Sequence, residues 1–287
     1  MRNRVLVLAA IAACAGPRPR PPRGEVVFSV TGRVQEGPYR FGRDDLPRLP
    51  RRAFRAMAPG SVSPARFEGV AVLALLQDAV ELEADADTVV FHGREGYRAA
   101  VPVGALRQLR PVLADQVGDA PVGAWRSEAA PLVLAWPNVE VPGIDSDPRM
   151  RWWWVPGVTT VELVSWTATY GRVLAVPRGA SDDARLGAGA VATQCMGCHR
   201  VRGVGGTRGR ELTGGAARRD LAAFAVSLRE HLKLVGKASA PETSPAAVRQ
   251  IDAFLRALDM AGPRSEEEGL PPVRLSPQLP PTRPRGY

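Results

Sequence analysis

The sequence predicts an α+β protein in which a mixed α/β region comes first and a small all-α region follows. Between residues 25 and 168, short runs rich in β-branched and aromatic residues alternate with turn residues, and no helical period lasts long enough for a bundle. Between residues 181 and 262, apolar residues recur at helical spacing. The chain has 287 residues, of which 45% are apolar, so it can supply a core for each of two modest domains.

The first 13 residues have the form of a bacterial export signal. Arg2 and Arg4 precede an apolar run that ends in small residues and is too short to span a bilayer. The run leads directly into Cys14, and the segment Ile11-Ala12-Ala13-Cys14 resembles the lipobox of bacterial lipoproteins. An ordinary signal peptide with an incidental cysteine is the alternative.

In the lipoprotein family this cysteine is lipidated and becomes the mature N-terminus. The resemblance therefore implies a lipid anchor at Cys14, followed by a stiff Pro-rich tether over residues 14–24. It implies a protein on the periplasmic side of a bacterial membrane. Residue 15 is Ala rather than Asp, so the family's inner-membrane retention signal is absent and an outer-membrane location is open.

The mixed region, residues 25–168, contains five runs with strand character. These runs are residues 26–30, 88–92, 97–103, 132–136 and 158–166. The second and third are expected to form a hairpin, because Gly93 and Gly96 lie between them. Short helices are predicted over residues 70–80 and 104–108.

Three helices are predicted in residues 181–262. Ser181 can cap the first, which should run to about residue 194. The second carries an apolar stripe from Leu221 to Leu232, and the third begins at Ser244-Pro245 and ends before Gly262-Pro263. Its buried face is expected to comprise Val248, Ile251, Phe254, Leu255 and Leu258. Residues 263–287 hold seven prolines and no apolar period, so a disordered tail is predicted there.

The formal net charge of +9 is unevenly distributed. The basic excess lies in the first 24 residues and in residues 171–262, whereas residues 25–170 are slightly acidic. Binding to nucleic acid would require a broad basic surface with interleaved aromatic side chains. The sequence lacks that pattern, so a nucleic-acid partner is not expected.

The motif with the clearest chemistry is Cys195-Met196-Gly197-Cys198-His199, a C-x-x-C-H string. Such a string is typical of covalent haem c attachment: Cys195 and Cys198 form thioethers, and His199 binds the iron as the proximal ligand. Three other uses exist. A thioredoxin-like dithiol needs a βαβ setting, which the flanking sequence lacks. A zinc site would need His231 as a fourth ligand beside Cys195, Cys198 and His199. A disulfide between the two cysteines is compatible with export.

The flanking sequence resembles class I c-type cytochromes. Residues 187–212 match the family pattern of a helix before C-x-x-C-H and a glycine-rich loop after it. The resemblance implies that a backbone carbonyl of this loop accepts the Nδ1–H of His199. Arg210 stands where the family usually has Pro.

The second axial ligand is less clear. In this family a Met-Pro pair usually precedes the last helix, but the matching position holds Ala240-Pro241. The candidates, in order of preference, are Lys237, Met260, His231 and an open position. The identity matters because Met raises the reduction potential, while nitrogen ligands lower it.

Several pieces of residues 25–168 resemble, in order, the molybdopterin-binding domain of the sulfite oxidase family. The pieces are residues 41–50, 67–76, 92–103, 131–137 and 152–164. The family's molybdenum-binding cysteine would fall between Arg51 and Glu68, and that stretch contains no cysteine. The expectation is a molybdenum-free relative that docks partners or positions the haem domain. A retained pterin without metal is the alternative.

Two further features of this region favour structural roles. His92 is its only histidine, and the run Trp152-Trp153-Trp154 is expected to pack against the sheet rather than to form a partner surface.

Together these features predict a membrane-anchored periplasmic monohaem c-type cytochrome. It would pass single electrons between periplasmic or membrane redox proteins, and would more naturally be a carrier than a catalyst. Two alternatives remain: a subunit of an oxidoreductase complex, or a haem or molybdopterin-type enzyme with an open haem site.

Overall fold

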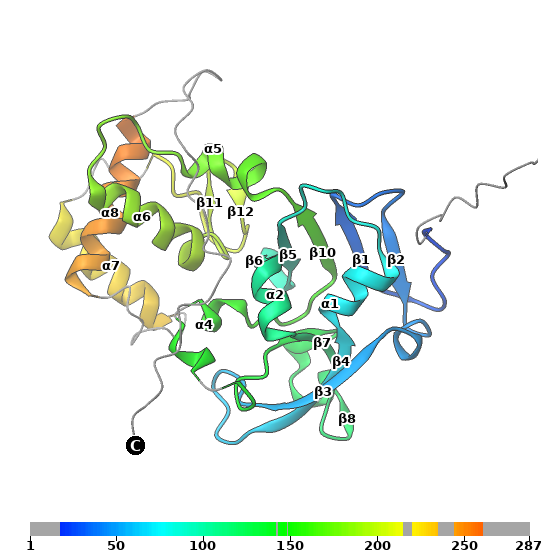
Figure 1. Ribbon diagram of the computed structural model, residues 1–287. Coiled ribbons are helices and arrows are strands. Elements are labelled where there is room, and N and C mark those ends of the chain that lie inside the picture. Colours follow the sequence, from blue (N-terminus) through cyan, green and yellow to red (C-terminus); the bar gives the residue numbers. More distant parts are fainter. Residues whose placement is uncertain (1–17, 142, 148, 215–219, 235–243, 261–287) are drawn as a thin grey trace, which may run out of the picture.

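The computed structural model describes residues 18–141, 143–147, 149–214, 220–234 and 244–260 (Figure 1). Two sheets form most of the region between Val26 and Val164. The first sheet has the strand order β2 (Tyr39–Gly42), β1 (Val26–Gly32), β10 (Thr160–Val164), β5 (Thr88–His92) and β6 (Arg98–Pro102). Strands β1 and β10 run parallel, and the other neighbours are antiparallel. The predicted β5–β6 hairpin is confirmed, with His92 opposite Arg98.

The second sheet has the order β3 (Arg51–Ala56), β4 (Ala65–Ala71), β7 (Val112–Val117) and β8 (Ala120–Pro121), and β9 (Val133–Ala135) also pairs with β7. All five predicted strands are present, as β1, β5, β6, β9 and β10. Strands β2, β3, β4, β7 and β8 were not predicted. The helix predicted over residues 70–80 begins later, because Val70 and Ala71 still pair with β7.

Short helices connect these strands. They are α1 (Val72–Ala74), continued by a π-helical turn over Leu75–Ala79, then α2 (Val103–Leu109), α3 (Val122–Trp125), α4 (Met150–Trp153) and α5 (Arg172–Leu174). Single 3-10 turns lie at Leu46–Arg48, Arg94–Gly96, Ser127–Ala129 and Ile144–Ser146, and a π-helical turn at Thr167–Gly171.

The tryptophan run packs inside, as predicted. Trp152, Trp153 and Trp154 are 8%, 2% and 9% exposed. Trp153 lies against Trp136 with ring centres 5.5 Å apart, and Trp154 meets the edge of Phe67 at 5.6 Å. Aromatic pairs of this kind bury large areas, so the segment around α4 is tied to the core shared by both sheets.

The three long helices α6 (Asp182–Ala190), α7 (Leu221–Leu234) and α8 (Pro245–Met260) lie together beside the sheets, on the left of Figure 1. The Ser181 hydroxyl accepts the Ala184 amide at 3.2 Å, which confirms the predicted cap. All five predicted core residues of α8 are buried. The predicted ends at Gly262-Pro263 and the tail over residues 263–287 lie outside the described residues.

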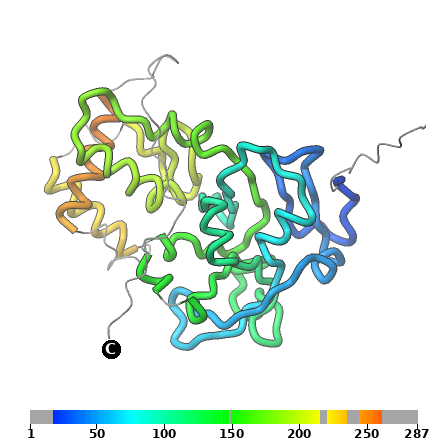
Figure 2. Tube along the Cα trace, in the orientation of Figure 1, coloured from blue at the N-terminus to red at the C-terminus, as the bar shows by residue number. Residues whose placement is uncertain are grey.

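The helical segment is continuous with the first sheet. Its apolar core includes Val90 of β5 and Val164 of β10. It also contains a two-residue ribbon, β11 (Arg200–Val201) with β12 (Val204–Gly205), which the prediction of an all-α region omitted. The trace in Figure 2 shows α7 and α8, yellow to orange, on the side of the molecule away from β1 and β2.

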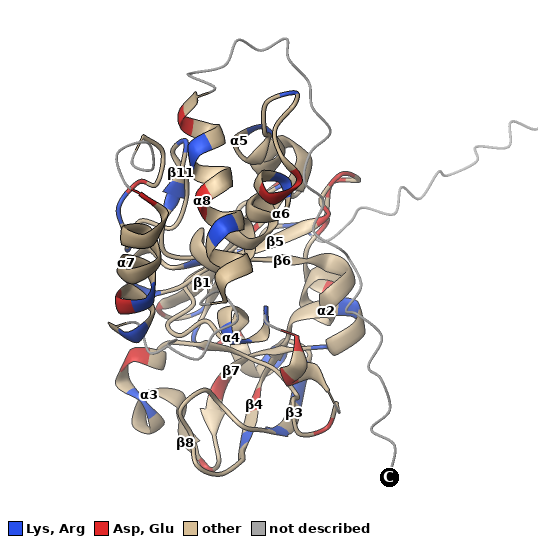
Figure 3. Cartoon of the chain, turned by 90° about the vertical axis from the view of Figure 1, so that its left-hand side faces the viewer, with Lys and Arg blue, Asp and Glu red and all other residues tan. Residues whose placement is uncertain are grey.

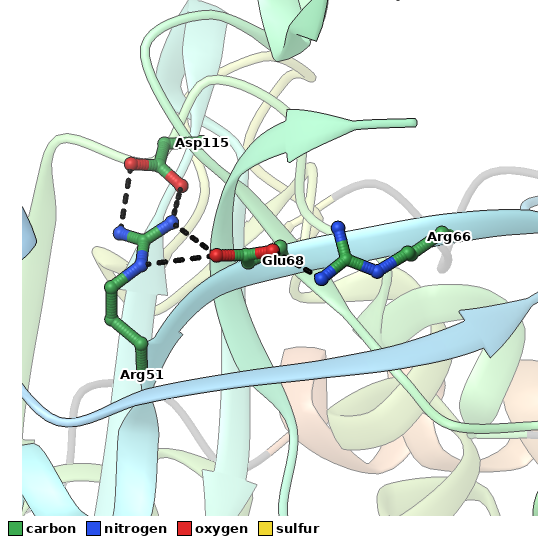
Figure 4. A network of polar contacts seen from close by, with 4 residues as sticks. All are labelled: Arg51, Arg66, Glu68 and Asp115. Atoms are coloured by element: carbon green, nitrogen blue, oxygen red, sulfur yellow. Dashed lines mark hydrogen bonds and ion pairs between the residues drawn. The ribbon is translucent and has the colours of Figure 1, made fainter. Parts of the chain in front are cut away.

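Polar contacts reinforce the second sheet. The guanidinium of Arg51 on β3 donates to both carboxylate oxygens of Asp115 on β7, at 2.8 and 3.1 Å, and lies 3.5 Å from Glu68 on β4 (Figure 4). Arg66 pairs with the other oxygen of Glu68 at 2.5 Å. The hydrogen bond to Asp115 raises the pKa of Arg51, against the opposing effect of burial.

Replacing Arg51 with leucine should lower the free energy of unfolding by about 2–3 kcal/mol, because the partly buried Asp115 loses its charged donor and Glu68 keeps only Arg66. Urea unfolding at neutral pH measures the change. Arg185→Ala is the matched control: it removes an exposed pair with Asp182 and should cost roughly 0.5 kcal/mol or less. Equal losses in the two variants would contradict a stabilising role for the network.

Candidate cofactor site

Cys195, Cys198 and His199 lie where helix α6 ends. The helix continues through a π-helical turn over Val191–Cys195, and the amides of Cys198 and His199 then donate to the Cys195 carbonyl at 3.1 and 2.9 Å. These contacts wind residues 195–199 into one tight turn, which keeps the two thiols and the imidazole close together. The structure forms no disulfide between the two cysteines. Met196 is buried in the apolar core behind the turn.

The loop after the motif fixes the ring of His199. The His199 Nδ1 atom lies 2.8 Å from the carbonyl oxygen of Arg210, so Nδ1 donates and Nε2 keeps its lone pair. Gly209 anchors the loop because its amide donates to the Cys198 carbonyl at 2.6 Å. The contact expected from the family resemblance is therefore present. It uses the main chain, so Arg210 supplies it as well as a proline would.

A cavity of about 850 Å³ opens in front of this turn. Its volume lies within the range of about 300–1,000 Å³ that is usual for ligand and cofactor pockets. Cys195, Cys198 and His199 form one side. Apolar side chains of α7 and α8 form another, namely Phe224, Leu228, Leu232, Ile251 and Leu255. Arg151, Arg208 and Arg210 line the cavity as well. A cavity with a mainly apolar lining, two thiols and a fixed imidazole has the size and the donor groups for a large planar metal-bearing cofactor.

The structure places the residues that the sequence suggested as a second axial ligand in different positions. His231 of α7 lines the same cavity as His199, and their ring centres are 5.5 Å apart with the planes at 65°. Met260, at the end of α8, is 86% exposed and does not line the cavity. Lys237 and Cys14 lie outside the described residues.

Burial lowers the pKa of His231, and the nearby charges of His199 and Arg210 lower it further. All three effects disfavour the imidazolium. His231 therefore presents a neutral imidazole at neutral pH, which is the form that binds metal ions.

No zinc site is formed by these residues. Within the described ranges, no three His, Cys, Asp or Glu side chains converge as ligands of a single ion. The zinc reading of the motif, which required His231 beside the two cysteines, gains no support from the geometry.

The first region supplies the remaining wall of the cavity, which sequence reasoning missed. Tyr97, Trp152 and Trp154 all line it. The hydroxyl of Tyr97 donates to the Trp152 carbonyl at 2.5 Å, and burial raises the pKa of this phenol. The tyrosine therefore stays protonated and ties the β5–β6 turn to α4.

The β5–β6 turn also contacts the C-x-x-C-H turn directly. The Arg98 amide donates to the Gly197 carbonyl at 2.8 Å, and the Thr207 amide donates to the Gly96 carbonyl at 2.9 Å. An ion pair between Arg208 and Glu95, at 3.2 Å, lies beside them. The only sequence signal for this junction was the pair of glycines in the turn, which predicted a hairpin but no partner for it.

His92 takes the structural role that was expected. Its Nε2 lies 2.7 Å from a carboxylate oxygen of Glu162 on the neighbouring strand β10. The hydrogen bond to His92 lowers the pKa of Glu162. His92 is not among the residues that line the cavity.

Charges on the helices alternate in sign. Figure 3 shows Lys and Arg interspersed with Asp and Glu along α7 and α8, without a broad basic face. On α8, for example, Arg256 bonds Asp252 one turn earlier at 2.8 Å. In the described part of the chain, none of the helices has the length and apolarity needed to cross a membrane.

Comparisons with known proteins give little further information. No family model matches the chain, and no curated protein matches it. Among solved structures, it is similar to the sulfane dehydrogenase SoxCD from Paracoccus pantotrophus, with 20% sequence identity and a TM-score of 0.38. The match covers 49% of this chain and 38% of that chain. Similarity this low assigns neither a fold nor an activity.

Proposed function

We propose that this protein is a monohaem c-type cytochrome that carries single electrons. The observation that supports it best is the C-x-x-C-H turn, which faces a cavity of about 850 Å³ with His199 held on the Arg210 carbonyl. Neither a dithiol nor a disulfide function needs such a cavity. A haem needs both the thiols and the space.

The residues present fit this cofactor. Cys195 and Cys198 would hold it through thioethers, each formed when a thiol adds across one vinyl group, with no leaving group and no change in oxidation state of the iron. His199 would bind the iron through Nε2, since Nδ1 is engaged by the loop. The haem would supply a reversible one-electron couple. The apolar side chains of α7 and α8 would exclude water from it and so tune its potential.

The first region would serve to position and shield the haem. Tyr97, Trp152 and Trp154 complete the cavity wall, and the Gly96 and Gly197 carbonyls tie the two regions together. A molybdenum-free relative of the sulfite oxidase family could keep its scaffold for this purpose. The Arg51 network in place of a metal-binding cysteine agrees with that role.

The protein would act at a membrane surface. The sequence at Cys14 supports lipid anchoring on the periplasmic side, and the electron donor and acceptor would be periplasmic or membrane redox proteins. The same anchor would suit a subunit of a larger oxidoreductase complex.

Expression of the full chain in a bacterium that exports proteins and matures c-type haem tests the proposal. One haem per chain, still attached after denaturation and acid-acetone extraction, is expected. The double variant Cys195→Ser/Cys198→Ser should contain no covalent haem. A redox titration of the haem-loaded protein should show a single reversible one-electron couple.

Cys14→Ser provides the matched cysteine control. It should keep the covalent haem but move the protein from the membrane fraction to the soluble periplasmic fraction. A wild-type chain without covalent haem would overturn the proposed function. Stoichiometric molybdenum in the purified protein would instead favour the molybdopterin-enzyme alternative.

A further inference from the structure

Helix α7 carries His231, which lines the same cavity as the C-x-x-C-H turn. Phe224, Leu228, His231 and Leu232 all line the cavity, at relative positions i, i+4, i+7 and i+8 of the helix. That spacing keeps them on one helical face. Lys233, one residue further, instead pairs with Glu230 at 2.8 Å, and both side chains are 60% exposed. Ser227 and His231 are the polar residues of α7 that line the cavity, and His231 is the one of the two with a metal-binding nitrogen.

The two imidazoles lie slightly closer together than they would on either side of a shared metal ion. Their ring centres are 5.5 Å apart. Two imidazoles on opposite sides of one metal ion, with metal–nitrogen bonds of about 2 Å, have ring centres roughly 6 Å apart. Because Nδ1 of His199 is engaged by the Arg210 carbonyl, its Nε2 is the atom left for the metal. Only a small outward movement of α7 would be needed.

The methionines of the described chain are placed elsewhere. Met150 and Met196 are 2% and 3% exposed within the apolar cores, and Met260 is 86% exposed. Met57, directly after β3, has its main chain bonded to the side chain of Asn138. None of them lines the cavity. A methionine ligand would therefore require a larger rearrangement than the movement of α7 that a His231 ligand needs.

We infer that His231 is the second axial ligand of the iron, so that the haem is held between two imidazoles. This inference rests on the proposed function and specifies it further. The sequence placed Lys237 and Met260 ahead of His231 as candidates for this ligand, and the inference reverses that order. Two nitrogen ligands would lower the reduction potential relative to a His–Met pair. The protein would thus serve low-potential electron transfer, with no open position for an exogenous ligand.

The test uses the haem-loaded full chain and its optical and paramagnetic resonance spectra. The wild-type haem should be low-spin with the signature of two imidazoles, without the near-infrared band of an iron–methionine bond. His231→Ala should be high-spin. If His231 occupies the iron in about nine of ten molecules, its removal should raise the apparent affinity for carbon monoxide roughly tenfold. Added imidazole should restore the low-spin spectrum of the variant.

Lys237→Ala and Met260→Ala are the matched controls and should retain the wild-type spectrum. His231→Met provides a second variant, which should remain low-spin and shift the potential upward. A haem-containing His231→Ala protein with the wild-type spectrum would overturn this inference alone. A wild-type chain without covalent haem would instead overturn the proposed function, and the inference with it.

Discussion

Replacing Gly187 with alanine is expected to destabilise the packing of α6 against α8. A Cβ at residue 187 would lie 1.9 Å from the carbonyl oxygen of Gln250 and 2.9 Å from the Cβ of Phe254. Both neighbours belong to α8, and the nearer one is a backbone atom that cannot rotate away. The helices must separate, which exposes apolar side chains such as Phe254, now fully buried. Overpacking of this kind costs roughly 3 kcal/mol.

The measurement is the free energy of unfolding from urea or thermal denaturation of the purified chain. Gly189→Ala on the same helix is the control, since a Cβ there meets nothing within 4 Å. Alanine has the higher helix propensity, so this variant should be as stable as wild type or more stable by about 0.5–1 kcal/mol. A Gly187→Ala protein as stable as Gly189→Ala would show that α6 and α8 are not packed this closely.

The helices could be predicted from the sequence because each one is amphipathic over several turns. In α8, the apolar positions from Val248 to Leu258 recur at helical spacing, and all of them are buried. Ser181 and the Ser244-Pro245 pair identified two helix starts for the same local reason. Such signals depend on residues within one element, so tertiary contacts do not alter them.

Seven of the twelve strands in the described residues were not predicted, and the composition of β3 shows one reason. Strand β3 reads Arg-Arg-Ala-Phe-Arg-Ala, which has no β-branched residue. It is a strand because Phe54 and Ala56 are buried while Arg51 pairs across the sheet with Asp115. Those partners are distant in the sequence, and a local propensity cannot register them.

The part of the candidate site that is local in the sequence could be predicted. Cys195, Cys198 and His199 form a local motif, and the loop that ends at Leu212 follows it directly. The wall made by Tyr97 and the Trp152–Trp154 segment depends on contacts between residues 55 apart in the sequence, and its contact with the C-x-x-C-H turn on residues about a hundred apart. The position of His231 relative to His199 depends on how α7 packs, which the spacing of apolar residues does not specify.

Replacing Gly209 with alanine is expected to have a large effect on the proposed haem site. A Cβ at this position would lie 2.4 Å from Cε1 and 2.5 Å from Nδ1 of His199. The collision falls on the edge of the ring that donates to the Arg210 carbonyl. Either the ring turns or the loop withdraws, and in both cases the hydrogen bond at 2.8 Å is lost.

Loss of that bond should weaken iron binding by His199, because the carbonyl orients the ring and increases the basicity of Nε2. Outer contacts of this type are worth roughly 10–100-fold in metal affinity. Gly209→Ala protein should therefore retain its thioethers but show a high-spin fraction and a raised reduction potential, measured by optical titration. Gly189→Ala, the same substitution without a neighbour, should leave both unchanged.

A loss of the low-spin state could come from the loop backbone or from the charge of Arg210, and a variant of Arg210 distinguishes the two. The hydrogen bond uses the main-chain carbonyl of Arg210, so Arg210→Ala should keep the low-spin spectrum even though a charge is removed from the cavity rim. If Arg210→Ala lost the low-spin state and Gly209→Ala kept it, the site would depend on the cation rather than on the loop backbone. If Gly209→Ala lost the low-spin state and Arg210→Ala kept it, the proposed iron ligand His199 would depend on the close packing of the loop against its imidazole. Only glycine permits that contact.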